Sequence, residues 1–136
     1  MSEIFVDTIR KTGGSLGTDI RVKNTSVYES DGGTSVTQNL VQGVAKAWLQ
    51  AADSASVRDS INIASGTDDG TGQYTYAFTN NFSNDDYAPT TTTIVAELHA
   101  VGSVGTSSFD IFIFSRQDSF AYADQVNYAS IHGDLA

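Results

Sequence analysis

Residues 66–79 read GTDDGTGQYTYAFT, and this stretch decides how the chain folds. Gly70 and Gly72 flank a single threonine, and polar and aromatic residues alternate after Gly72. Alternation with a period of two is typical of a half-buried strand. The Asp69-Gly70 pair supplies the positive φ that a tight hairpin turn requires. The stretch therefore predicts a hairpin whose second strand places these rings on one face: Tyr74, Tyr76 and Phe78.

These residues exclude a ligand-binding glycine loop, which is the other structure that such glycines can form. A dinucleotide-binding turn needs Gly-x-Gly-x-x-Gly between a strand and a helix, and Thr75 stands where the third glycine belongs. The segment that follows has a strand pattern, so no helix N-terminus is offered to a phosphate. No lysine follows the glycines, which excludes a P-loop as well.

Strand patterns continue along the chain, separated by turn residues. We expect one strand over 56–65 (SVRDSINIAS), whose shared face carries Val57, Asp59, Ile61 and Ile63. We also expect a long threonine-rich strand over 87–101 (YAPTTTTIVAELHAV), a strand over 107–116 (SSFDIFIFSR) and a last one over 126–136. In FDIFIF, one face carries Phe109, Ile111 and Ile113, and the other carries Phe112 and Phe114. Many short strands with turn signals predict a mainly β fold, an antiparallel β-sandwich or a partly closed barrel.

The stretch 36–52 (VTQNLVQGVAKAWLQAA) can be read in two ways. Its apolar residues fall at helical spacing, but Gly43 weakens a continuous helix. A helix-like neck up to Gly43, followed by a strand from Val44, fits equally well. The expected organisation is an extended arm over 1–35, this neck over 36–52 and a β head over 53–136.

Length, composition and charge limit the classes of function that the chain can have. The chain has 136 residues, enough for one ordinary domain, and no cysteine. Its net charge is −9, of which residues 1–35 carry −1 (four basic, five acidic) and residues 36–136 carry −8 (three basic, eleven acidic). Nucleic-acid binding requires clustered basic residues, so we expect no nucleic-acid partner. No basic-then-apolar leader and no apolar run of about 20 residues are present, so we expect neither a signal peptide nor membrane insertion.

The sequence offers no local catalytic motif. His99 and His132 lie 33 residues apart and form no metal-ligand spacing, although a metal shared across a symmetry axis stays an alternative. The adjacent pairs Asp68-Asp69 and Asp85-Asp86 point to opposite faces of a strand, and NNFSNDDY lacks the rhythm of a calcium loop. We expect no enzyme, no cofactor and no metal, with a small hydrolase as the least favoured class.

Two segments have the composition of recognition loops. TNNFSNDDY (79–87) and SRQDSFAYADQ (115–125) combine amides, hydroxyls and carboxylates with Phe and Tyr. Rigid rings beside adaptable hydrogen-bonding groups are typical of antibody paratopes. The candidate receptor-binding residues are Asn80, Asn81, Asn84, Asp86, Tyr87, Arg116, Gln117, Asp118, Phe120 and Tyr122.

Several stretches resemble small tail-fibre-like virion proteins of bacteriophages, especially marine ones. They are LVQGVAKAWLQ (40–50), SVRDSINIASGTDDGTGQYTYAFTNNFSNDDY (56–87), IHGDLA (131–136) and VDTI (6–9). The resemblance implies a homotrimeric, β-rich, non-enzymatic protein whose N-terminal part attaches to the virion and whose β head points toward the host. The chain departs from that pattern at LQAADSAS after Trp48, and residues 88–127 match no motif of the family.

The expected function is therefore a phage tail fibre or tail-tip protein on the virion exterior, made in the host cytoplasm and binding a host glycan or protein. The alternative is a capsid head fibre or decoration protein with a purely structural role. The candidate trimer contacts are Leu40, Val44, Trp48, Phe112 and Phe114. The candidate contacts of the arm with other virion proteins are Ile4, Phe5, Val6 and Ile9.

Overall fold

The structure, a computed structural model, describes residues 27–30, 33–39 and 43–133. Most of the expected arm therefore lies outside the described residues, as do its candidate virion contacts and the candidate trimer contact Leu40. Within the arm and neck, β1 (Val27–Ser30) pairs antiparallel with β2 (Gly33–Asn39) to form a small hairpin.

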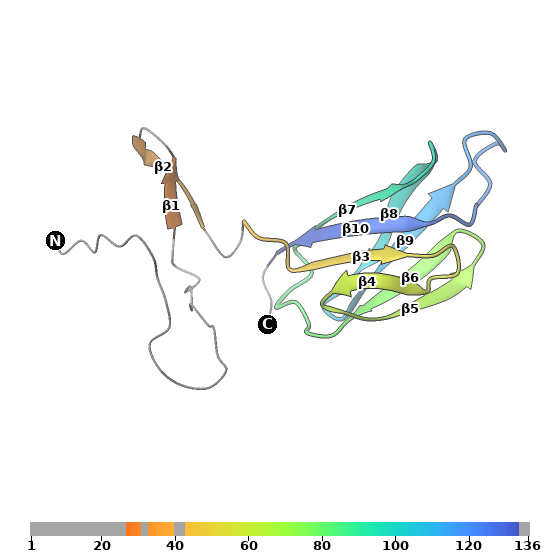
Figure 1. Cartoon of the computed structure of the whole chain (residues 1–136), viewed down its shortest axis with the longest axis horizontal. Helices are drawn as coiled ribbons and strands as arrows, with labels where there is room; N and C mark the ends of the chain where they lie inside the picture. Colours follow the sequence, from red (N-terminus) through yellow and green to blue (C-terminus); the bar gives the residue numbers. More distant parts are fainter. Residues whose placement is uncertain (1–26, 31–32, 40–42, 134–136) are drawn as a thin grey trace.

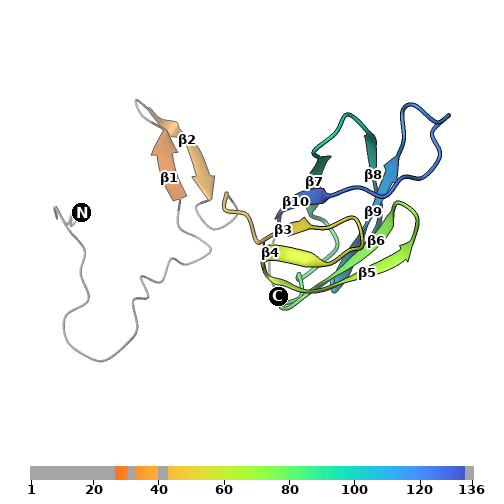
Figure 2. The same ribbon diagram turned by 45° about the vertical axis from the view of Figure 1, so that its right-hand side comes forward.

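The head consists of two four-stranded antiparallel sheets that lie face to face (Figure 1 and Figure 2). The first, here called the β3 sheet, has the order β4 (Val57–Ile61), β3 (Ala47–Ala51), β10 (Asn127–His132) and β7 (Ala88–Thr93). The second, the β6 sheet, has the order β5 (Ile63–Gly70), β6 (Gln73–Phe78), β9 (Ser108–Phe114) and β8 (Leu98–Val104). The mainly β expectation is confirmed, and the fold is a sandwich and not a closed barrel.

The expected helix-like neck is wrong, since the described residues contain no helix. Residues 36–39 of the stretch belong to strand β2 (Gly33–Asn39), and Ala47–Ala51 is strand β3 of the sandwich. Residues 40–42 lie outside the described ranges. The strand reading from Val44 onward was the better of the two, because the alternation of β3 buries Ala47, Leu49 and Ala51.

Two strands that were expected to be continuous are each divided in two. Residues 56–65 turn a corner at Asn62, which has a φ of 56°, so that β4 belongs to the β3 sheet and β5 to the β6 sheet. Asparagine tolerates this left-handed conformation better than most residues. The Asn62 side chain also fixes the corner, because its Oδ1 accepts the amide of Asn80 at 2.7 Å and its Nδ2 donates to the Asn80 carbonyl at 3.0 Å. The threonine-rich stretch likewise divides into β7 and β8, with a turn over 94–97 between the sheets.

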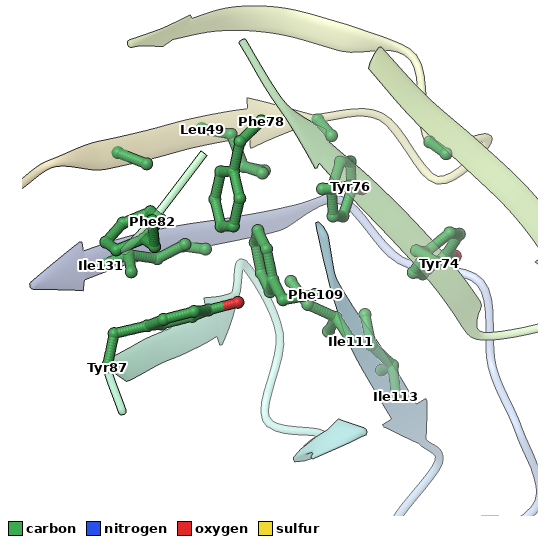
Figure 3. Close-up of a cluster of buried hydrophobic side chains, with 14 residues drawn as sticks. Leu49, Tyr74, Tyr76, Phe78, Phe82, Tyr87, Phe109, Ile111, Ile113 and Ile131 are labelled. Atoms are coloured by element: carbon green, nitrogen blue, oxygen red, sulfur yellow. The ribbon is translucent and has the colours of Figure 1, made fainter. Parts of the chain in front are cut away.

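The core lies between the sheets, and large residues of the β6 sheet meet small residues of the β3 sheet (Figure 3). The β6 sheet contributes the buried side chains Tyr74, Tyr76, Phe78, Phe109, Ile111 and Ile113. The β3 sheet contributes Ala47, Leu49, Ala51, Ala129 and Ile131. The expected alternation of β6 and β9 is therefore confirmed, and it sets the face that each strand buries.

The turn between β5 and β6 is the hairpin that the sequence predicts. Gly70 and Gly72 have φ values of 144° and 63°, which favour glycine. Gly72 is buried, its amide donates to Asp124 Oδ1 at 2.6 Å, and its carbonyl accepts the amide of Ile113 at 2.9 Å. The turn therefore packs against the end of β9 and the loop that follows it.

We predict that Gly72→Ala destabilises the head. A Cβ there would lie 2.5 Å from the Ile113 carbonyl oxygen and 2.7 Å from the Ala123 amide nitrogen, on a left-handed backbone. Overpacking and the unfavourable φ together should lower the free energy of unfolding by about 2–4 kcal/mol. Urea denaturation followed by circular dichroism measures the loss.

Gly105→Ala is the matched control. A Cβ at Gly105 would meet only the Ser108 carbonyl oxygen at 3.5 Å, an ordinary contact, so this variant should lose less than about 1 kcal/mol. Equal losses in the two variants would contradict the role given to Gly72.

Candidate functional site

The two predicted recognition loops lie at opposite ends of the sandwich (Figure 1). We call the end where the chain enters near Val44 and leaves at Gly133 the proximal end, and the other the distal end. Residues 79–87, the proximal loop, connect to the proximal turn over 105–107, where the amide of Phe82 donates to the Thr106 carbonyl at 2.9 Å. Residues 115–125, the distal loop, lie beside the distal turn at Gly72, where Ala123 would meet an added Cβ. One contact surface cannot include both loops.

The proximal loop closes the core at its end of the sandwich. The rings of Phe82 and Tyr87 are buried, with centroids 4.5 Å apart. The Tyr87 hydroxyl donates to the Gly105 carbonyl at 2.9 Å, with the Ser108 carbonyl 3.2 Å away. Burial raises the pKa of Tyr87 to about 12. Tyr87 is thus a core residue, and its assignment as a receptor contact is wrong.

The polar candidates of the proximal loop remain on the surface. Asn80, Asn81, Asn84 and Asp86 are exposed. Asn80 is engaged through its backbone with Asn62, and Asn84 Oδ1 accepts the amide of Asp86 at 3.1 Å. These contacts shape the loop itself, so part of its polar chemistry is structural.

The distal loop folds back on the end of β9. The amide of Ser115 donates to the Ala121 carbonyl at 2.8 Å, and the amide of Phe120 donates to the Ser115 carbonyl at 3.1 Å. Ser119 and Phe120 have φ values of 49° and 61°, a conformation that costs a bulky residue free energy. The Phe120 side chain is nevertheless 63% exposed. The loop therefore holds a ring toward solvent on a strained backbone.

Other apolar side chains lie at the same corner of the sandwich as the distal loop. Tyr122 stacks on Phe114 with centroids 4.7 Å apart, and Leu98 pairs with Phe114 across β8 and β9. The β7–β8 turn is bound to the distal loop, because Glu97 Oε2 accepts the amide of Arg116 at 2.6 Å. The exposed apolar residues of this distal corner are Ile94, Val95, Leu98, Phe120 and Tyr122. Arg116, Gln117 and Asp118 are exposed beside them.

A buried tyrosine hydroxyl fixes the base of the distal loop. The Tyr74 hydroxyl donates to the Asp53 carbonyl at 3.0 Å and lies 3.2 Å from Asp124 Oδ1, while the amide of Gln125 donates to it at 3.2 Å. Burial, with the Asp124 charge as a further cause, raises the pKa of Tyr74 to about 12. Sequence reasoning missed Asp124 and this hydroxyl, because nothing in the local pattern relates Tyr74 to a residue 50 positions away.

The four candidate trimer contacts that lie within the described residues do not form one patch. Phe112 and Phe114 are half-buried on the outer face of the β6 sheet, where Phe112 lies so close to Gly102 that an added Cβ would be 2.7 Å from its ring. Trp48 is half-buried on the outer face of the β3 sheet, on the other side of the molecule. Val44 is 60% exposed at the proximal end.

Two carboxylates lie close together in the structure, although they are not neighbours in the sequence. Asp69 Oδ2 and Asp110 Oδ1 lie 2.6 Å and 2.9 Å from the Thr75 hydroxyl oxygen. A hydroxyl has a single proton to donate, so it can satisfy only one of them at a time. In the described ranges, no three His, Cys, Asp or Glu side chains are grouped so that they could hold a metal ion.

In comparisons with known proteins, no family model, curated protein or solved structure matches the chain. Within the described residues there is also no helix with the length and apolar character to cross a bilayer. Functional inference therefore depends on the surfaces of the sandwich and on the resemblance noted above.

The described histidines have different environments. His132 is exposed at the end of β10. His99 pairs with buried Ile113 across β8 and β9, and both of its ring nitrogens are buried without a hydrogen-bond partner. Burial lowers the pKa of His99 below its ordinary value of 6.5, so the folded protein holds it neutral.

We predict that His99 makes the head less stable in mild acid. The unfolded chain binds the proton near pH 6.5 and the folded chain only at lower pH, so stability is fully present above 6.5 and is lost as the pH falls below it. His99→Leu should flatten the pH dependence of the urea midpoint between pH 7 and pH 5. His132→Gln is the control and should leave that slope unchanged; an equal slope in His99→Leu would show that His99 is not its source.

Proposed function

We propose that the chain is a bacteriophage virion appendage whose head contacts the host surface through the distal corner. The observation that carries the proposal is the ring of Phe120, which the distal loop holds 63% exposed on a left-handed backbone. Strained backbone that the surrounding structure enforces is concentrated at binding sites. The resemblance to tail-fibre-like virion proteins is the reason for proposing that the chain is part of a virion.

The distal corner has the physical properties of a recognition site. Its loop is fixed at the base by the Tyr74 and Asp124 contacts and at the side by Glu97, so little conformational entropy would be lost on binding. Exposed aromatic rings on such a rigid scaffold provide contact area at low entropic cost. Arg116, Gln117 and Asp118 add hydrogen-bonding groups at the edge.

The chain direction supports one orientation of the head on the particle. The segment that precedes the sandwich joins it at the proximal end, close to Val44. If residues 1–35 attach to the virion, the distal corner points away from the particle and toward the host. Several heads on one particle would then bind at the same time, and this avidity would raise the affinity of a single head by about 10²–10⁴-fold where the geometry permits.

We propose no catalytic activity for the head. His99 cannot reach a substrate with its nitrogens buried. The Asp69 and Asp110 carboxylates flank the Thr75 hydroxyl on an outer sheet face, and its single proton can bond to only one of them at a time. A purely structural role as a capsid head fibre or decoration protein is the second candidate, and it is favoured by the core position of Tyr87, which leaves a single loop with exposed rings.

We further propose that the protein is a homotrimer in which the outer face of the β6 sheet meets its neighbours. The distal part of this face carries half-buried Phe112 and Phe114, apolar rings of the kind that mark protein interfaces, and the Asp69 and Asp110 carboxylates lie beside them on the same face. We predict that Phe112→Ser lowers the molar mass of the purified protein in light scattering from that of three chains to that of one at micromolar concentration. Thr67→Ser, on exposed β5 of the same sheet, is the control and should leave the mass unchanged. A wild-type protein that is monomeric and folded would contradict the trimer.

For the distal corner, we predict that Phe120→Ala combined with Tyr122→Ala abolishes adsorption of the assembled particle to host cells. Alanine keeps the backbone strain of residue 120 but removes the ring, so the fold should persist, with a loss of about 1 kcal/mol from the Tyr122–Phe114 stack. Adsorption and a melting curve are measured together.

Two further variants make this test specific. Val44→Ala removes an equally exposed apolar side chain at the proximal end and should leave adsorption unchanged. Phe120→Asn should remove adsorption while raising the free energy of unfolding by about 1 kcal/mol, because asparagine tolerates the left-handed conformation. Normal adsorption by the folded double variant would reject the distal corner as the contact and favour the decoration role.

A further inference from the structure

The outer face of the β3 sheet combines two aromatic rings with neutral polar side chains. Strand register places the outward residues in two rows across the four strands β4, β3, β10 and β7. The first row is Ile61, Trp48, Ser130 and Thr90. The second row is Asp59, Gln50, Tyr128 and Thr92. We call these eight residues the polar aromatic face.

The two rings lie diagonally across the β3–β10 pair. Trp48 is opposite Ser130 and Tyr128 is opposite Gln50, so the rings are one step apart along the strands and within reach of one ligand. Both rings are half-buried, which limits their rotation. Gln50 Nε2 lies 3.4 Å from the Tyr128 hydroxyl, so an amide stands beside the ring.

The polar aromatic face differs in chemistry from the outer face of the β6 sheet. The β6 sheet presents the rings of Phe112 and Phe114, which are suited to another protein surface, beside the carboxylates of Asp69 and Asp110. The polar aromatic face has one aliphatic member, Ile61, and its other positions carry hydroxyls, an amide, a carboxylate and two rings. The buried centre of a protein–protein interface is more apolar than this.

We propose that the polar aromatic face binds a neutral saccharide. The face of an aromatic ring carries negative charge density and attracts the polarised C–H groups on one side of a pyranose. Amide, hydroxyl and carboxylate groups beside the rings exchange hydrogen bonds with sugar hydroxyls. Two rings and an open sheet surface match successive units of an extended chain.

Charge favours a neutral ligand over a charged one. Asp59 is the one acidic member of the face and no basic residue belongs to it, in a protein of net charge −9. The nearest basic side chain along β3 is that of Lys46, two residues before Trp48, and its Nζ donates to the Val44 carbonyl at 2.9 Å, so the eight residues themselves offer an anionic polymer repulsion and no cation. A neutral oligosaccharide meets neither that repulsion nor the cost of removing water from an unpaired charge.

The saccharide inference rests on the proposed function in one respect. The proposed function supplies the source of the saccharide, since host envelopes display oligosaccharide chains. In the proposed trimer, the β6 sheet faces the neighbours and leaves the polar aromatic face outward. The head would thus have two host contacts, an apolar one at its distal corner and a saccharide one along its side.

The experiment uses a property of the sequence, because Trp48 is the single tryptophan of the chain. Its fluorescence therefore reports on this face alone. Full-length protein is titrated with maltohexaose, cellohexaose, laminarihexaose and mannohexaose, and with a polygalacturonate oligomer as the anionic probe. A saturable change in Trp48 emission with at least one neutral probe and none with the anionic probe is expected. No change with any neutral probe overturns the proposal.

Variants that keep Trp48 locate the site. Tyr128→Ala should weaken binding about tenfold or more, as expected for an aromatic contact at the centre of a site, and Gln50→Ala should weaken it several-fold. Gln73→Ala is the matched control, because Gln73 is also a half-buried glutamine on an outer sheet face, at the start of the inner strand β6 and opposite Phe112. Equal loss in Gln50→Ala and Gln73→Ala would overturn the assignment to this face.

Self-association is the competing occupant. If Trp48 emission shifts to the blue with protein concentration alone, and light scattering shows that Tyr128→Ala prevents the accompanying gain in mass, the face binds a second copy and the saccharide proposal is wrong. The proposed function fails separately: saccharide binding with normal adsorption of the Phe120 and Tyr122 double variant would reject the distal corner. Lost adsorption without any saccharide binding would reject the inference of this section alone.

Discussion

The fold depends on how three buried tyrosines satisfy their hydroxyl groups. Tyr76 donates to Asn127 Oδ1 at 2.8 Å in the middle of the sandwich, and Asn127 is itself fully buried. Tyr74 is bonded at the distal end and Tyr87 at the proximal end. A buried hydroxyl without a partner costs about 1–3 kcal/mol, so each ring has one acceptable depth and direction. Together the three contacts fix the sheets relative to each other along the whole length of the core.

Size complementarity then determines what each sheet contributes. The β6 sheet presents large rings and branched side chains, and the β3 sheet accommodates them with alanines such as Ala47, Ala51 and Ala129. Because protein interiors are close-packed, a slip of one residue in β6 would bring Thr75 and Ala77 inward and leave both polar groups and voids in the core. The same alternation decides the outer faces, so the two candidate contact surfaces are consequences of core packing.

Features of the fold that depend on neighbouring residues could be predicted from the sequence. Alternation in β6 and β9 and the glycines of the β5–β6 turn are properties of neighbouring residues, and both were predicted. The corner at Asn62 was missed because Ile61 and Ile63 continue the alternation of apolar residues on both sides of it. The turn at 94–97 (IVAE) was missed because it lacks glycine, proline, asparagine and aspartate, the residues that normally signal a turn.

The candidate sites show the same limit. Both recognition loops could be found by composition, but Tyr87 and Tyr122 are equivalent in that respect, each an aromatic residue within a polar segment. Only the three-dimensional structure buries the first and places the second on the surface beside Phe114. Which loop shares an end with the chain entry is also a matter of topology and not of local pattern.

The two ends of the sandwich differ in their structural role. At the proximal end, Phe82 and Tyr87 close the core, and the hydrogen bonds of the Asn62 side chain with the Asn80 backbone hold the connection between the sheets. That stability permits the distal end to keep an unfavourable backbone at Ser119 and Phe120, since a strained loop persists only where its surroundings enforce it. The enforcing contacts are those of the exposed Asp124 carboxylate with the Gly72 amide and the Tyr74 hydroxyl, and Gly72 and Tyr74 are buried. The exposed ring of Phe120 is thus supported by the same tyrosine interactions that hold the sheets together.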